Sequence, residues 1–566
     1  MSRIRRAMTG AALGAAVGAL VFLADLVGAL LALASVFDPQ WAAAVPILIA
    51  AATQVIAATT IGAIVGFAWP AARKLSIRRR PLAAGAATAA LVIAVGAYLT
   101  GRSPQAPTLG PRPPPGAPNP ESVLWITVDT LRADYVYGPN NDFPMSPALR
   151  RLADRALTFT DAEAGSGWTI PSLATLMTGI HPETLQSARR FVPDWAPTIA
   201  ERMRAAGYET AALVDNAIVE KRNGFAQGFE TWRGRSAARF AFALPGYRFL
   251  PLLARHWVRE VVPIFYEGSP RVTDAALSVI GRPRTAPLFL YVHYMDPHYP
   301  YYPHIENGKE PDGGPWFSLA AARQRADSNV KPTPAQLALL THRYAGEIRA
   351  WDRDLGRLVT AWQDRFGDDS VVMITGDHGD EFMEHGSLGH GHSLHRELVH
   401  VPLLVQPPSR LKLAVPLGTR IATPVGLVDV LPTTLEMLGL PPDVGADGIA
   451  LQGISWLPWL DGRAAAPERP VFASQSHSRR RIYRWREGSW SRITTFEKNR
   501  DVADELFDLR SDPGELKNVI ATEPEVLSAM LSHSEPFMRQ QEAERDPRPV
   551  HGDDNAEALR ALGYTQ

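Results

Sequence analysis

Three apolar runs in this chain of 566 residues end in side chains that can bind a metal ion. The runs are SVLWITV, PLFLYVHYM and SVVMITG, and the side chains at or just after their ends are Asp129, His293, Asp296, His298, Asp377 and His378. Carboxylate oxygens and imidazole nitrogens suit divalent ions such as Zn²⁺, Mn²⁺, Mg²⁺ or Ca²⁺. The pattern therefore predicts metal-assisted chemistry.

A hydroxyl that such an ion could activate lies in GSGWTIPSLATLMTGIHP, residues 165–182. Pro171 and Gly179 predict a helix that starts near Thr169, and one interpretation is that Thr169 or Ser172 only caps its first turn. The other interpretation is that Thr169 is a nucleophile, because helix amides attract anions and a bound cation lowers the pKa of a hydroxyl. The two interpretations are compatible.

The elements that must position these groups begin near residue 122. Short apolar runs alternate there with stretches of helical spacing, which predicts an α/β fold with a mostly parallel central sheet flanked by helices. In open α/β sheets, functional groups gather outside the carboxyl ends of the strands. We therefore expect the three strand ends and the helix start at Thr169 to form one site.

Residues 1–101 predict a membrane region. They are dominated by Ala, Val, Leu, Gly and Ile, and three stretches are long enough to span a bilayer, namely residues 8–37, 41–71 and 82–99. Basic clusters before the first stretch and between the second and third are expected in the cytoplasm, so the rest of the chain is expected on the other side, the periplasm in a Gram-negative bacterium. Asp25 in the first stretch is interpreted as a packed polar group rather than a relay.

A proline-rich tether, residues 102–122, follows the membrane region. We predict a catalytic domain over residues 123–466 and a C-terminal subdomain over residues 467–566, where alternating runs indicate a small antiparallel sheet. A basic run in this subdomain, residues 479–481 with Arg484, is interpreted as a solvated strand face rather than a contact to substrate phosphate or lipid.

The overall composition excludes some classes of function. The 58 basic and 58 acidic side chains balance, so no nucleic-acid partner is expected. The chain contains no cysteine, which excludes disulfides, thiolate metal sites and a cysteine nucleophile.

Six sequence blocks resemble, in order, those of the sulfatase family within the alkaline phosphatase superfamily. They are VDTLRAD, TIPSLATLMTG, HYMDPHYPY, YAGEIRAWDRDLGRL, TGDHGDEFMEHGSLGHG and ELFDLRSDPGELKNV. The resemblance implies an alkaline-phosphatase-like fold and a metal-dependent hydrolase or transferase. It also implies that Asp129, Asp377 and His378 bind one divalent ion, and that Thr169 is the nucleophile and touches the ion.

The same resemblance implies several contacts to the substrate. His298 matches a substrate-binding histidine, and His390 falls where many members have a lysine, with His392 as the neighbouring candidate. Asn216 is a further candidate contact. We expect His298 or His390 to protonate the departing oxygen. A second ion, held by Asp296, His298, His390 and His392, is the alternative to a single ion.

Three departures from the family pattern bear on the chemistry. Thr130 stands where many sulfatases have a second aspartate ligand, and Leu173 replaces an arginine. Thr169 stands where such enzymes convert a Cys or Ser to formylglycine, so no formylglycine is expected. A formylglycine hydrate has two hydroxyls and can expel a sulfuryl group by elimination, whereas a threonine ester must be broken by attack at the transferred atom, the ordinary route of phosphoryl transfer.

These features predict a membrane-anchored enzyme that hydrolyses or transfers a phosphate ester or phosphodiester of a lipid-linked or cell-envelope substrate, including glycans. One alternative is a sulfuric ester hydrolase. From another class, the alternative is a noncatalytic membrane receptor for anionic glycans or lipids.

Overall fold

The structure is a computed structural model that describes part of the chain. The described residues are 121–137, 146–185, 191–234, 268–299, 301, 304, 308–311, 331–441, 450–477, 480–497 and 503–544. All of them belong to one compact unit. The three predicted membrane stretches, Asp25 and nearly all of the tether lie outside these ranges. Of the helices within them, none is long and apolar enough to cross a membrane.

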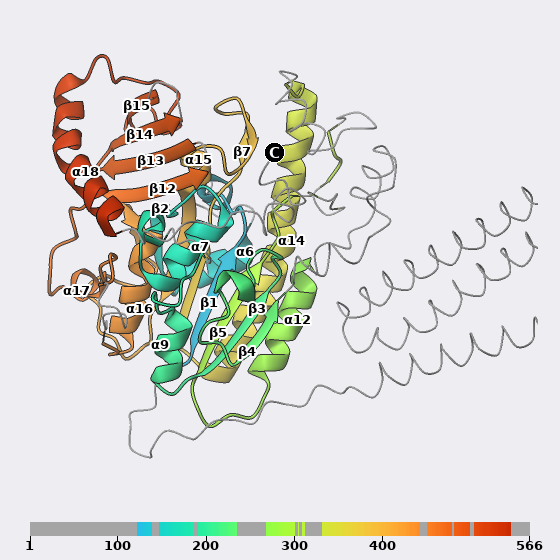
Figure 1. Ribbon diagram of the computed structural model, residues 1–566. Helices are drawn as coiled ribbons and strands as arrows, with labels where there is room; N and C mark the ends of the chain where they lie inside the picture. The colour runs from blue at the N-terminus through green and yellow to red at the C-terminus, as the bar shows by residue number, and fades with distance from the viewer. Residues whose placement is uncertain are drawn as a thin grey trace, which may run out of the picture. The chain divides into compact units, whose positions relative to one another are not determined.

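A mostly parallel sheet forms the centre of the unit (Figure 1), in the order β10-β2-β9-β6-β1-β5-β3-β4, with β11 also paired to β2. Its strands are β1 (Val123–Val128), β2 (Leu157–Glu163), β3 (Glu209–Val214), β4 (Thr231–Gly234), β5 (Leu288–Tyr294), β6 (Val371–Gly376), β9 (His400–Gln406), β10 (Arg420–Ile421) and β11 (Val425–Gly426). β9 runs antiparallel to β2 and β6, and the other pairs are parallel. The predicted sheet type is confirmed.

Helices cover both faces of this sheet. They are α5 (Ala133–Val136), α6 (Pro147–Ala153), α7 (Thr169–Thr178), α8 (Pro182–Leu185), α9 (Ile199–Ala205), α12 (Gly268–Ile280), α14 (Pro334–Phe366), α15 (Arg396–Val399), α16 (Val430–Met437) and α17 (Leu457–Leu460), with 3₁₀ turns η1 (Lys221–Asn223) and η5 (Leu427–Asp429). Val123 and Trp125 of β1 pack in one core cluster with α7, α9 and α16. Leu124 and Ile126 pack in the other with α6, α12 and α14. Both faces of β1 are thus buried, as a sheet covered on two sides requires.

The long helix α14 shows how local sequence sets an element. Pro334 occupies its first turn, and Thr333 and Gln336 form a capping box in which each side chain accepts the other's backbone N–H. Trp351 and Trp362 on its inner face are fully buried against the sheet. The helical spacing predicted for this segment is confirmed.

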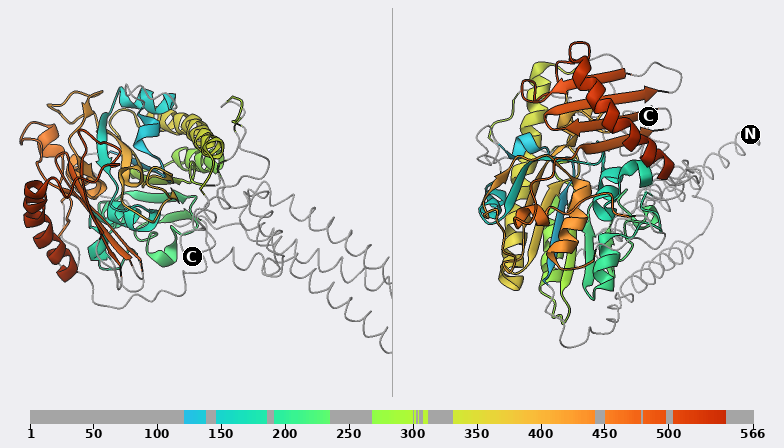
Figure 2. Two further views of the ribbon diagram at one scale, coloured as in Figure 1. Left: turned by 90° about the horizontal axis from the view of Figure 1, so that it is seen from above. Right: turned by 90° about the vertical axis from the view of Figure 1, so that its left-hand side faces the viewer.

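A second, antiparallel sheet follows, formed by β12 (Val471–His477), β13 (Arg480–Glu487), β14 (Trp490–Glu497) and β15 (Ala503–Asp508). Helix α18 (Pro524–Glu544) lies across one face (Figure 2), where Met530 packs on Tyr483 and Trp485. The opposite face packs Ile482 and Phe507 against Leu394. The predicted C-terminal antiparallel sheet is therefore confirmed.

Arg484 of β13 lies on the face that packs toward the main sheet. Its side chain is 0% exposed; it donates two hydrogen bonds to Glu163 at 3.0 Å and one to Glu515 at 2.7 Å. The expected solvated face is therefore wrong for Arg484. The reason is the two-residue alternation of β13, which places Arg484 on the same side as the core residue Ile482, where two carboxylates neutralise its charge.

Candidate active site

Three neighbouring strands deliver ligand side chains to one edge of the main sheet. β1 lies between β5 and β6 in parallel register. Asp129 follows β1, Asp377 and His378 follow β6, and His293 is the penultimate residue of β5. One ligand atom each from Asp129, His293 and Asp377 lie within 4.8 Å of one another. The strand register thus gathers groups that are far apart in the sequence.

Each carboxylate of this group uses one oxygen in hydrogen bonds and keeps the other unpaired. Asp377 Oδ1 accepts the backbone N–H groups of Thr130 at 3.1 Å and His378 at 2.8 Å. Asp129 Oδ2 accepts from Asn216 Nδ2 at 2.7 Å. Asp377 Oδ2 and Asp129 Oδ1 are buried and have no hydrogen-bond partner. A bound cation would remove the desolvation penalty on these oxygens, so the donor set fits the divalent ion that the resemblance implies.

His378 is oriented toward the same point. Its Nδ1–H donates to the Gly379 carbonyl at 2.8 Å, which leaves Nε2 3.6 Å from Asp129 Oδ1 and 3.8 Å from Asp377 Oδ2. Gly379 itself allows a close approach, since a Cβ there would lie 2.0 Å from the Glu397 carbonyl oxygen. The turn after β6 therefore needs glycine at this position.

His293 is a candidate ligand that the resemblance did not indicate. It is 0% exposed, its Nε2 is 3.5 Å from Asp129 Oδ2, and its Nδ1 is 2.7 Å from Thr127 Oγ1. The signal available in the sequence is a histidine within an otherwise apolar strand, one residue before the strand ends.

Thr169 is the first residue of α7, and its hydroxyl faces the metal group. Thr169 Oγ1 lies 3.1 Å from His378 Nε2. Because Nδ1 of this ring already donates a hydrogen bond, the Thr169 hydroxyl donates to Nε2. Ser172 Oγ donates to the Asp377 carbonyl at 2.5 Å, which fixes the start of α7 against the β6 turn. The residue before the helix, Trp168, makes no side-chain cap.

Thr130 shows that this turn is held under strain. Its φ of 55° is in the left-handed region, which a β-branched residue rarely adopts. Two contacts maintain it: the N–H of Thr130 donates to Asp377, and its carbonyl accepts from Tyr344 Oη at 2.6 Å. The strained turn directs the Thr130 N–H to the ligand carboxylate.

The two aspartates respond differently to burial. Burial acts to raise the pKa of Asp129, but His298, His293 and His378 outweigh it and hold that pKa well below the usual range. Burial and the negative charge of Asp129 raise the pKa of Asp377 well above its usual value. Two adjacent buried carboxylates do not both carry charge easily, and a divalent cation bound between them would favour the charged form of both.

Two further histidines stand beside this group. His298 Nδ1–H donates to the Tyr299 carbonyl at 2.6 Å. His390 Nδ1–H donates to Asp380 Oδ1 at 2.7 Å, and its ring centroid lies 4.6 Å from that of His378 and 5.1 Å from that of His298. Burial lowers the pKa of His390 to about 3, although Asp380 opposes the shift. The His390 imidazole is therefore neutral.

The other predicted site residues have different surroundings. Asn216 donates to Asp129, so it orients a candidate ligand. His392 Nε2 donates to Glu381 at 2.6 Å, and Asp296 accepts from the Ser269 backbone at 2.8 Å. His392 and Asp296 therefore have partners away from His298 and His390. Among the residues that the structure describes, these four side chains are not gathered closely enough to bind a common second ion.

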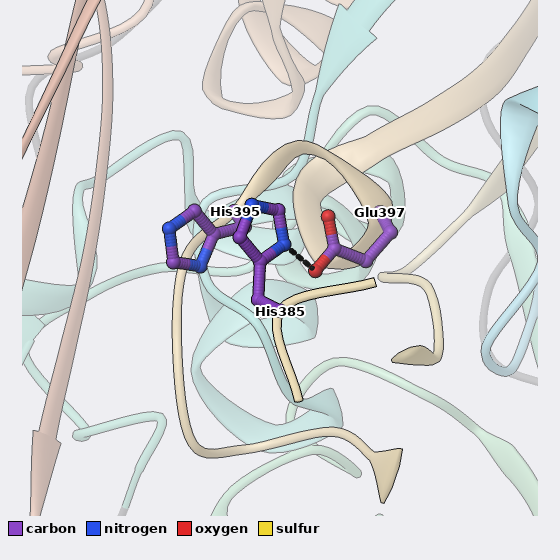
Figure 3. A group of neighbouring side chains, drawn as sticks. All are labelled: His385, His395 and Glu397. Atoms are coloured by element: carbon purple, nitrogen blue, oxygen red, sulfur yellow. Dashed lines mark hydrogen bonds and ion pairs between the residues drawn. The ribbon is translucent and has the colours of Figure 1, made fainter. Parts of the chain in front are cut away.

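A second candidate metal group is formed by His385, His395 and Glu397 (Figure 3). In it His385 and Glu397 form an ion pair, and the His395 ring stacks on His385. Figure 3 shows the His385 ring between the Glu397 carboxylate and the His395 ring. The two rings stack at 3.7 Å with planes 7° apart, so an ion in the plane of one ring would lie well outside the plane of the other. His385 donates from Nδ1 to Glu397 at 2.8 Å and from Nε2 to the Glu515 carbonyl at 2.9 Å. Both nitrogens face acceptors, as expected of an imidazolium.

This pair predicts a pH-dependent contribution to stability. Burial acts to lower the pKa of His385, but Glu397 outweighs it and raises the pKa to about 9. Because the pKa of His385 is higher in the folded protein than in the unfolded chain, the charged His385–Glu397 pair stabilises the fold fully below about pH 6.5. This stabilisation is lost as the pH rises through 9. We expect His385→Gln to lower the free energy of unfolding by on the order of 1 kcal/mol at pH 6, after solvent screening, and by much less at pH 9.5.

Thermal unfolding of the wild type and His385→Gln across this pH range measures the difference. The control is His533→Gln, which removes an exposed imidazole 3.0 Å from Glu487 and should change stability little at each pH. A wild-type advantage that grows from pH 6 to pH 9.5 would contradict the assignment of a charged His385.

The sequence and the fold are similar to those of known proteins. The sulfatase family model matches residues 121–440, more than half of the chain. Arylsulfatase K of Danio rerio is 24% identical over 451 residues, which cover 72% of this chain and 81% of that protein. Phosphonate monoester hydrolase of Silicibacter pomeroyi has a TM-score of 0.58 at 21% identity, with 75% of this chain and 96% of that chain covered.

A solved complex with D-glucosamine-2-N,6-O-disulfate as substrate has a TM-score of 0.56 at 16% identity, with 76% of this chain and 99% of that chain covered. The structural likenesses confirm the alkaline-phosphatase-like α/β fold. The chain belongs to the sulfatase family of ester-cleaving hydrolases.

Proposed function

We propose that the protein is a metal-dependent esterase that cleaves or transfers a phosphate ester or phosphodiester through Thr169. The observation that carries the proposal is the position of Thr169 Oγ1, 3.1 Å from His378 Nε2. This nitrogen lies 3.6 Å from Asp129 Oδ1 and 3.8 Å from Asp377 Oδ2, the two buried oxygens without a hydrogen-bond partner. A receptor that only binds anions has no need of this combination. The structural likeness to a phosphonate monoester hydrolase supports chemistry at phosphorus.

The ion would be held by Asp129, Asp377, His378 and Thr169, and it would supply positive charge that lowers the pKa of the Thr169 hydroxyl and neutralises charge on the ester. Thr169 Oγ1 bonds to phosphorus, and its proton passes to solvent. The bond from phosphorus to the departing oxygen breaks in line with this attack. Backbone N–H groups at the start of α7 would bind an anionic oxygen of the ester.

His298 is assigned the proton transfers. In its protonated form it donates a proton to the departing oxygen, and in the second step it takes one from the attacking water or acceptor alcohol. Phosphorus then bonds to the new oxygen, the bond to Thr169 Oγ1 breaks, and Thr169 regains a proton from solvent. His390 is neutral and bonded to Asp380, so it does not serve as the acid in this scheme.

We propose the location of the enzyme and its substrate class from the sequence of residues 1–122. Residues 1–101 are proposed to cross the membrane three times, and the tether to hold the catalytic domain at the periplasmic or other extracytoplasmic surface. A lipid-linked or cell-envelope ester is then the substrate within reach. The second candidate function is hydrolysis of a sulfuric ester, which the likeness to arylsulfatase K and to the glucosamine disulfate complex favours.

One comparison decides between the substrate classes. Full-length protein purified in detergent is assayed with each divalent metal against nitrophenyl phosphodiester, phosphate monoester and sulfate. The proposal predicts metal-dependent turnover of a phosphorus ester that exceeds turnover of the sulfate and is absent in Thr169→Ala. Faster turnover of the sulfate would support the second candidate, and metal binding without any turnover would support a receptor. Thr178→Ala is the matched control, because this hydroxyl only donates back to Ala174 within α7.

A further inference from the structure

We propose that His293 is a ligand of the same ion and takes the place of the second carboxylate that the sulfatase pattern has at Thr130. The inference rests on one part of the proposed function, namely that the site binds a divalent ion. It adds a residue that the motif resemblance does not assign, and it changes the chemical character of the donor set.

The first argument is the state of the His293 side chain. It is 0% exposed, and its Nε2 has no hydrogen-bond partner. A buried imidazole nitrogen without a partner loses its hydration without compensation. His293 belongs to the group with Asp129 and Asp377, in which one ligand atom from each residue lies within 4.8 Å of the others. Each of these two carboxylates also has one buried oxygen without a hydrogen-bond partner. Three neighbouring buried residues that each have a donor atom without a hydrogen-bond partner indicate a shared cation.

The second argument is distance. His293 Nε2 is 3.5 Å from Asp129 Oδ2, which is longer than the roughly 2.8 Å of a charge-assisted hydrogen bond. Donors that each lie about 2.1 Å from a common ion are separated by roughly 3 to 3.5 Å at tetrahedral or right angles. His378 Nε2, at 3.6 Å from Asp129 Oδ1, has similar spacing. The separations are those of ligands around an ion.

The third argument is the support behind the ring. His293 Nδ1 is 2.7 Å from Thr127 Oγ1, which is 2.7 Å from Tyr291 Oη. Thr127 is the register partner of His293 across β1 and β5. A hydrogen bond from Nδ1–H to Thr127 fixes the tautomer with the lone pair on Nε2, the arrangement that metal-binding histidines use.

The consequence is a preference among metals. With His293 and His378 the site offers two imidazoles and two carboxylates, in addition to the Thr169 hydroxyl. Imidazole nitrogens suit Zn²⁺ and similar transition metals, whereas Ca²⁺ and Mg²⁺ prefer oxygen donors. The site is therefore expected to select Zn²⁺ over Ca²⁺, more strongly than a site with an aspartate in place of His293.

The test measures metal binding rather than turnover. Full-length protein in detergent is stripped with a chelator and titrated with Zn²⁺ and with Ca²⁺. We expect one Zn²⁺ per chain for the wild type and for Thr169→Ala, and a loss of affinity of at least about 100-fold for His293→Ala. His293→Asp should keep binding an ion but lose at least about tenfold in preference for Zn²⁺ over Ca²⁺. The control His395→Ala, in the stacked pair, should bind as the wild type does.

Wild-type Zn²⁺ affinity in His293→Ala would overturn the inference while leaving the proposed function intact. If His293→Ala does not fold, the metal preference of His293→Asp decides, and an unchanged preference overturns the inference. A wild-type protein that binds no ion and still cleaves esters would instead overturn the proposed function. Weaker Zn²⁺ binding by His395→Ala would place the ion at the other cluster and also overturn the inference.

Discussion

Replacing Thr169 with alanine is expected to lower kcat by at least about 10⁴-fold, the scale seen when a covalent nucleophile is removed. Thr169 Oγ1 is the hydroxyl beside the candidate ligands, and without it no ester intermediate can form. Thr169→Ser keeps a hydroxyl at the same atom and should retain measurable turnover. Steady-state kinetics with a nitrophenyl phosphodiester, at saturating metal, measures the effect.

Thr178→Ala is the control for a threonine lost from α7, and its kcat should stay near the wild-type value. The Thr178 hydroxyl is buried in the helix and bonded to Ala174. A Thr169→Ala variant that turns over at a wild-type rate would show that the attacking group is not Thr169.

The largest effect on stability is expected for Arg484→Met. This change removes the positive charge between Glu163 and Glu515. Burial raises the pKa of Glu163, but Arg484 and Arg486 outweigh burial and lower that pKa to about 2. Without Arg484, Glu515 loses its ion-pair partner, and Glu163 loses two hydrogen bonds and keeps the one from Arg486 at 3.0 Å. We therefore expect a loss of about 3 to 5 kcal/mol in the free energy of unfolding. Denaturant unfolding followed by tryptophan fluorescence measures this loss.

The matched control is Arg539→Met, which removes an exposed pair with Glu535 on α18. Its change should remain within about 0.5 kcal/mol. Equal stabilities for Arg484→Met and Arg539→Met would mean that the buried cluster does not hold the C-terminal sheet against the main sheet.

The fold could be predicted from the sequence because apolar residues recur clearly with the spacing of strands in some segments and with the spacing of helices in others. The buried runs of β1, β5 and β6 and the helical spacing of α12 and α14 were each recognisable, and the alternation of β13 indicated the C-terminal sheet. The strand-end rule placed Asp129 and Asp377 on the same edge. Register then determined that their carboxylates share one buried point.

Other features depend on contacts that the sequence does not reveal. The strand-end pattern grouped His293 with the metal-binding side chains, but the motif resemblance gave it no role, and only the structure shows that it lies beside Asp129 and Asp377. The two-residue period assigns Arg484 to a face but does not show that Glu163 and Glu515, which lie far away in the sequence, meet it there. Asn216 was expected to contact the substrate, and only the structure shows its hydrogen bond to Asp129.

The central claim is that Thr169 forms a covalent ester during turnover, and analysis of acid-quenched protein tests it most directly. Full-length enzyme loaded with metal is mixed with a phosphodiester, quenched within the first turnover, digested and examined by mass spectrometry. The account predicts a phosphoryl adduct on the peptide that contains Thr169, which is absent when the ester is omitted and in Thr169→Ala. An adduct on another residue, or complete first-turnover cleavage with Thr169 unmodified at every quench time, would contradict it.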